Sequence, residues 1–140
     1  MSIALYPALV FTVALLVTTA YFLMGGLPLL VLGHDSALDA RFIRGFFNFY
    51  YKAAFITATG AALSFAGLGR AGFAIGAAAL ALGVVLLRRQ LIPVMDQLGT
   101  QIQARAPSAV RRFRKVHGLA LLLNLLQLLL LVWALTKFSL

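Results

Sequence analysis

Four polar side chains interrupt stretches that are otherwise apolar, and through them this chain could do chemistry: Lys52, His117, Asn124 and Gln127. The last three are spaced seven and three residues apart, so they share one face of a helix. Hydrocarbon does not tolerate such a face, and we expect it to turn toward other helices. The two amides there serve either as glue between helices or as the wall of a polar path.

Lys52 is the charge placed deepest in an apolar stretch. It follows the basic boundary of its helix by eight residues, and Asn124 follows that of its own helix by nine. At roughly 1.5 Å per residue both lie about 12–14 Å inward, so they could meet. We expect a polar intramembrane pocket that suits an anionic headgroup, a carboxylate or a phosphate, lined by Lys52, Asn48, His117, Asn124 and Gln127. The alternative is that the lysine ammonium group snorkels back to the lipid headgroups.

The sequence lacks the residue combinations that enzyme active sites usually contain. It contains no acidic pair, no acid–histidine pair within one span and no phosphate-binding loop. It has no cysteine, which excludes disulfides, thiolate catalysis and cysteine-ligated metal. His34 and His117 could together ligate haem or a metal, but a loop histidine and a member of an interfacial basic cluster explain them more simply. We therefore predict no catalytic residue, no metal site, no cofactor and a non-enzymatic protein.

Composition places the chain in a membrane. Of its 140 residues 63% are hydrophobic and 11% are charged, whereas soluble domains carry about 45–50% apolar and about 25% charged residues. The apolar stretches predict one domain, residues 1–140, that is an all-α, polytopic membrane four-helix bundle with spans over about 3–32, 41–68, 71–92 and 110–138. The first apolar run has no Lys or Arg before it, so we expect a retained span and no cleaved signal peptide.

Residues between the spans predict where helices start and bend. Ser36, followed by Asp39, resembles a capping box, so the second helix should start in water, before the membrane. The third helix either continues beyond the membrane, bent at Pro93, or gives way to an interfacial helix. Ser108 is expected to cap the fourth helix.

Glycines mark two further places. Gly25, Gly26 and Pro28 predict a kinked, closely packed end of the first span or a flexible segment that lines a site. Gly72 and Gly76 form a GxxxG pair, which predicts close packing within the bundle or, alternatively, dimerisation.

The distribution of charge predicts the topology. A net charge of +9 would suggest nucleic acid in a soluble protein, but the positive-inside rule explains it here, and no nucleic-acid partner is expected. The first and third loops should face the cytoplasm and both termini the opposite side, in the inner (plasma) membrane of a bacterium. Anionic lipid headgroups are the expected partners of the basic residues that flank these loops: Arg41, Arg44, Arg88, Arg89, Arg111, Arg112, Arg114 and Lys115.

The segment from Phe113 to Leu131, FRKVHGLALLLNLLQLLLL, resembles the last helix of the TMEM-205-like membrane proteins, a domain of unknown function. GGLPLLVL in the first span and RGFFNFYYK in the second are similar to that family too. The resemblance implies a four-helix bundle, and animal members are linked to drug resistance and trafficking. A weaker resemblance, in the small-residue and proline segment of the first span, is to the copper-resistance D proteins and the HemJ-type protoporphyrinogen oxidases. HemJ-type proteins carry an early histidine where this chain has Tyr6-Pro7-Ala8, so the likeness does not extend to a porphyrin site.

These observations favour a non-enzymatic integral membrane protein, either a small scaffold or an accessory subunit of a membrane complex. Its partners would be other membrane subunits or further copies of itself. A transporter or permease-like protein for a small anionic solute is the first alternative, and a haem- or quinone-linked membrane oxidoreductase is the second.

Overall fold

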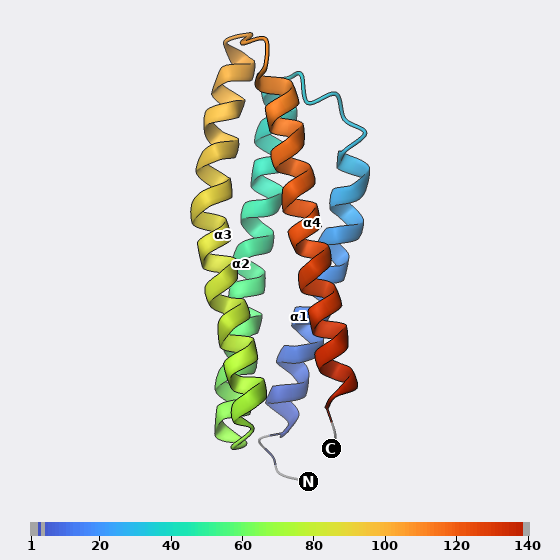
Figure 1. The fold of residues 1–140 in the computed structure, drawn as a ribbon, viewed down its shortest axis with the longest axis vertical. Coiled ribbons are helices and arrows are strands. Elements are labelled where there is room, and N and C mark those ends of the chain that lie inside the picture. Colours follow the sequence, from blue (N-terminus) through green and yellow to red (C-terminus); the bar gives the residue numbers. More distant parts are fainter. Residues whose placement is uncertain (1–2, 4, 139–140) are drawn as a thin grey trace.

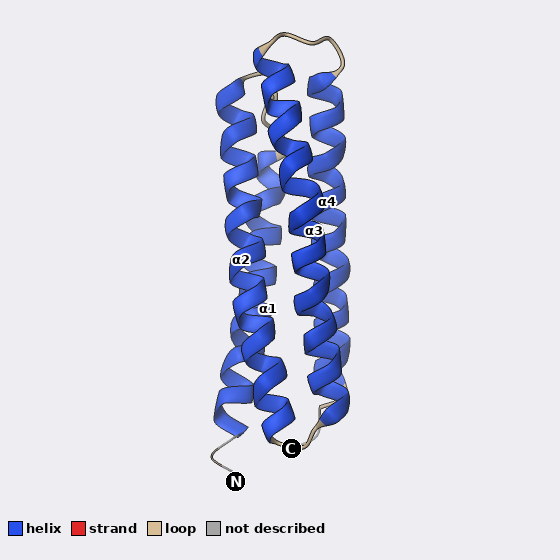
Figure 2. Cartoon of the chain, turned by 90° about the vertical axis from the view of Figure 1, so that its left-hand side faces the viewer, coloured by secondary structure: helices blue, strands red, loops and turns tan. Residues whose placement is uncertain are grey.

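The computed structural model describes residues 3 and 5–138 of the chain, and Ala4, which the expected first span includes, lies outside the described residues. The described chain forms four helices: α1 Leu5–Leu29, α2 Ala37–Gly67, α3 Ala71–Gln103 and α4 Ala109–Thr136. They lie side by side, and consecutive helices run in opposite directions (Figure 1). The α1–α2 and α3–α4 loops meet at one end, called here the basic end, and the α2–α3 turn lies at the other (Figure 2). The expected all-α four-helix bundle is confirmed.

The helices α1, α3 and α4 are each long and apolar enough to cross a membrane. α2 packs against both α1 and α3 and carries its charged residues in its first half. α3 has 33 residues and is therefore about 50 Å long, which exceeds a hydrocarbon core of roughly 30 Å. Since α3 carries its charges from Arg88 onward, we assign the part that exceeds the hydrocarbon thickness to the basic end. Of the two predictions for the third helix, the structure shows one continuous helix through Pro93 and no separate interfacial helix within the described residues.

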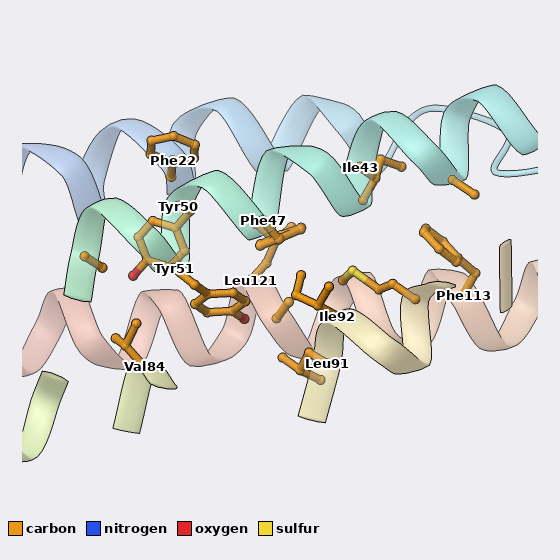
Figure 3. Packing of buried hydrophobic residues seen from close by; sticks show 14 of the residues in the cluster. Phe22, Ile43, Phe47, Tyr50, Tyr51, Val84, Leu91, Ile92, Phe113 and Leu121 are labelled. Carbon is orange, nitrogen blue, oxygen red and sulfur yellow. The ribbon is translucent and has the colours of Figure 1, made fainter. Parts of the chain in front are cut away.

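The core is built mainly on α2 (Figure 3). Large aromatic side chains fill it toward the basic end, where Phe47, Tyr50 and Tyr51 are buried against α1, α3 and α4. Further along α2 the buried positions become alanines, so the neighbouring helices can approach its backbone. Gly60 lies in this stretch, and the ring of Phe11 from α1 occupies the space where a β-carbon would stand. The packing of α1 on α2 therefore depends on a glycine that the sequence did not mark as special.

The two capping predictions have different outcomes. Ser36 is the N-cap of α2, and its hydroxyl accepts a hydrogen bond of 3.1 Å from the Asp39 backbone N–H, as predicted. Ser108 precedes α4 but makes no side-chain capping bond, so that prediction is wrong. Its backbone lies near helical values, with φ −98° and ψ −6°, whereas a capping hydroxyl is aimed at the helix from an extended backbone.

The prediction that Gly72 and Gly76 pack within the bundle is wrong. Both are exposed, and a β-carbon added at either would meet nothing within 4 Å. α3 instead turns the face that carries Ala77, Ala81 and Val84 toward its neighbours. The alternative, contact with another molecule, stays a prediction.

The glycine–proline segment of the first span forms a closely packed helix end. α1 remains helical one residue past Pro28. A β-carbon on Gly26 would collide with the Leu121 side chain of α4, so only glycine allows α4 to approach this closely.

Candidate functional site

A pair of buried histidines lies at the basic end of the bundle, where the α1–α2 loop meets α4. His34 and His117 are both fully buried, and His34 Nε2 lies 2.9 Å from His117 Nδ1. The outer nitrogens face backbone carbonyls: His34 Nδ1 lies 2.5 Å from Leu32 O and His117 Nε2 lies 3.2 Å from Gly26 O. The rings thus join the end of α1, the loop and α4 in one chain of contacts.

Local backbone structure explains why the Gly26 carbonyl is free to face the ring of His117. At the end of α1 the Leu30 N–H bonds to Leu27 O, a tighter turn that leaves Gly26 O without its usual partner four residues on. The ring of His117 occupies that position. His34 has a φ of 58°, in the left-handed region, which turns its ring back over the end of α1.

The number of protons on the two rings limits which of their contacts can be hydrogen bonds. Two neutral rings carry two N–H groups, but three contacts need a donor. Two of the three contacts can therefore be hydrogen bonds at the same time, and the tautomers of the two rings decide which two they are. One added proton would complete the chain and leave a single buried positive charge.

The electrostatic surroundings of His34 favour the neutral pair. Burial is the largest influence and lowers the pKa of His34 below its ordinary 6.5. The hydrogen bond to the Leu32 carbonyl opposes that shift, the Arg114 guanidinium adds to it, and Asp39 and Asp35 oppose it weakly. Phe47 and Phe113 close the remaining sides of the ring pair and keep water out.

A second polar cluster lies deeper, around Asn124. With its amide oriented so that both ends find partners, Asn124 donates to Thr19 O at 3.3 Å and to Tyr50 Oη at 3.1 Å, and its oxygen accepts from Leu23 N–H at 3.2 Å. One turn further, Gln127 Nε2 donates to Thr19 Oγ1 at 3.4 Å. The cluster links α4 to α1 and α2, so these amides hold helices together, the first of the two roles predicted for them.

The predicted pocket of Lys52 is not formed. Lys52 is exposed on the outer side of α2, whereas Asn124 and Gln127 are buried on the inner side of α4. Asn124 does lie beside this part of α2, since its amide contacts Tyr50 Oη, but Tyr51 and not Lys52 takes the inward position. Asn48, on the same stripe as Lys52, accepts a 2.9 Å hydrogen bond from Arg88 Nε on α3 and does not meet Asn124 either.

The basic residues of the expected headgroup cluster divide into two groups. Arg44 is paired with Asp96 at 2.7 Å, Arg88 binds Asn48, and Arg114 Nη2 donates to Leu32 O at 3.2 Å. The others stand exposed around the basic end, and none of them forms an ion pair with another described residue: Arg41, Arg89, Arg111, Arg112 and Lys115. Arg105, in the α3–α4 loop, extends this exposed positive surface.

Metal ligation does not fit this arrangement. Each ring nitrogen of the histidine pair faces a protein atom, so binding of an iron or zinc ion would break a contact that now holds α1, the loop and α4 together. Within residues 3 and 5–138 there is no group of three or more potential metal-ligating side chains.

Sequence reasoning considered His34 and His117 together only as possible ligands of haem or a metal and missed their direct contact. It also missed Thr19 and Tyr50 as partners of Asn124. A histidine in a short loop gave no sign of burial. Thr19 does share a helical stripe with Leu15 and Phe22, and that spacing was the available signal.

No protein-family model, curated protein or solved structure matches this chain.

Proposed function

We propose that this chain is a non-enzymatic integral membrane protein, a small scaffold or accessory subunit of a membrane complex, that binds a partner subunit through its basic end. The observation that carries the proposal is the separation of two kinds of polar group. Those inside the bundle bind one another and the backbone, as His34 with His117 and Asn124 with Tyr50. Most of the exposed cations gather at the basic end, which is therefore the largest part of the surface open to polar recognition; Lys52, Arg70 and Lys137 lie elsewhere.

The exposed cations of the basic end lie at different levels along the bundle. Arg89 and Lys115 lie near the level where the charged part of α3 and α4 begins, and they suit anionic headgroups. Arg105, in the α3–α4 loop, and Arg111 and Arg112, in the first turn of α4, lie further toward the tip of the bundle. An acidic surface on a neighbouring subunit is the chemistry that these three residues fit, because charge complementarity directs association.

The alternatives receive less support from the geometry. Transport of an anionic solute relied on Lys52 inside the bundle, and Lys52 is exposed. A haem-linked oxidoreductase relied on free histidine nitrogens, and these are engaged. We include in this proposal the resemblance to TMEM-205-like proteins and a location in the bacterial inner membrane, since both are consistent with a membrane scaffold.

A photo-crosslinking experiment in native membranes tests the proposal. A photoreactive amino acid at Arg112 should crosslink to one discrete membrane polypeptide, and the same group at Leu122, an exposed apolar position of α4, should not. Changing Arg105 and Arg111 together to glutamine should abolish that crosslink while leaving the protein in the membrane. If position 112 crosslinks only to lipid, or if the product is unaffected by the double change, the basic end does not bind a partner subunit.

A further inference from the structure

A lateral groove lies between α3 and α4 at the end of the bundle away from the basic end. Its volume is about 540 Å³, which is within the roughly 300–1,000 Å³ typical of ligand pockets. One wall is the small-residue face of α3, with Gly72 and Gly76, and the other is the last part of α4, with Leu130, Trp133 and Ala134. The exposed glycines, which make no contact within the bundle, therefore form the open wall of this groove.

The groove is apolar along its length and has cations at its mouth. Lys137 and Phe138 line the outer end, and the Arg70 guanidinium carbon lies 5.6 Å from the centre of the Phe138 ring. The chain has only three acidic residues, all placed at the basic end of the bundle by their positions in the sequence: Asp35, Asp39 and Asp96. The mouth is thus a place of local positive charge with no carboxylate side chain to neutralise it.

We propose that this groove binds an acyl chain of an anionic phospholipid, with the lipid phosphate held by Lys137 and Arg70. The apolar walls face hydrocarbon in a membrane, so a lipid chain fills them without loss of hydrogen bonds. The cations stand where a headgroup at that membrane surface would lie, since Lys137 follows the last turn of α4.

A second copy of the chain fits this groove less well than a lipid does. In a two-fold symmetric pair the same patch meets itself, so the groove mouths would bring Lys137 and Arg70 of one copy against the same cations of the other. Like charges placed together oppose association. An anionic headgroup has the complementary charge.

The protein carries its own reporter for this site. Trp133 is the single tryptophan of the chain and lines the groove. Brominated acyl chains quench tryptophan fluorescence on contact, so reconstitution with either phosphatidylglycerol or phosphatidylcholine in brominated form measures which lipid occupies the groove. Attraction by one nearby cation corresponds to about a fivefold preference for an anionic lipid. We expect phosphatidylglycerol to be preferred at Trp133 by at least that factor, and less so at high salt.

Two variants and a control make the test specific. Lys137→Gln combined with Arg70→Gln should reduce the preference to within about twofold of none, and Gly76→Leu, which fills the glycine wall, should reduce the quenching by phosphatidylglycerol. Lys52→Gln removes an exposed cation outside the groove and should leave both quantities unchanged. The proposal is overturned if the unmodified protein shows no preference, or if the paired variant retains it. It is also overturned if Trp133 is shielded from both lipids and the shielding grows with protein density, which would place a second copy in the groove.

Discussion

Replacing His117 with leucine tests whether the histidine pair holds the bundle together. The leucine side chain is of similar size, so little cavity is expected. The change removes the ring nitrogen that lies 2.9 Å from His34 Nε2 and leaves that buried polar atom without a partner. An unpaired buried polar atom costs about 1–3 kcal/mol, and we expect the free energy of unfolding to fall by that amount.

A double-mutant cycle separates this contact from other effects of the substitution. His34→Asn is the suitable second change, because asparagine tolerates a left-handed backbone such as the φ of 58° at this position. Its shorter side chain no longer reaches His117. The coupling between the two changes should be at least about 0.5 kcal/mol, the lower end for residues in direct contact.

Unfolding by sodium dodecyl sulfate in mixed micelles, followed by circular dichroism, measures these free energies. Leu122→Ala is the control, since Leu122 is exposed on the same helix and its change should stay within about 0.5 kcal/mol. The description of the pair is wrong if His117→Leu is as mild as this control. It is also wrong if the two histidine changes simply add.

Three further predictions use the same unfolding assay. Because burial lowers the pKa of His34 below 6.5, the unfolded chain binds more protons as the pH falls below that value. Stability should therefore be lower at pH 5.5 than at pH 7.5, with a smaller difference in His34→Asn. Gly60→Ala should destabilise by about 1–3 kcal/mol because its β-carbon meets the ring of a neighbouring phenylalanine, whereas Gly76→Ala should be neutral or stabilise by up to about 1 kcal/mol. Lys52→Met and Asn124→Leu should add within about 0.5 kcal/mol, since the two side chains share no partner; coupling above that would restore the pocket.

The sequence was sufficient to predict which segments are helical and where polar residues occur along them. Composition and span length predicted four helices, the Ser36–Asp39 pattern predicted the start of α2, and the amides of α4 were correctly expected to face inward. These features depend on local spacing and on the energetic penalty of polar groups in hydrocarbon, both of which are written in the chain itself.

Which side of a helix faces the interior of the bundle was harder to predict, and the wrong predictions are errors of this kind. Lys52 and Tyr51 are neighbours, and which of them turns inward depends on how α2 packs on three other helices. By residue type, Gly60 and Gly76 could equally permit the close approach of another helix. Of these two, only Gly60 is packed against a neighbouring helix of the bundle. The partnership of His34 with His117 joins residues 83 positions apart, which no local spacing reveals.

The positions of the buried polar groups explain why the lateral groove lies where it does. α4 is joined to the other helices by hydrogen bonds of His117, Asn124 and Gln127, and between Gln127 and residue 138 no side-chain hydrogen bond joins it to another helix. Apolar contacts between membrane helices lack a hydrophobic driving force. The end of α4 beyond Gln127 is therefore the part that can separate from α3. Amide hydrogen exchange in micelles should therefore be faster over residues 130–134 of α4 than over residues 54–58 of α2, where Ala54 and Ala58 are fully buried. Equal protection of the two segments would show that the end of α4 is held as firmly as the rest, and the groove would then need a different cause.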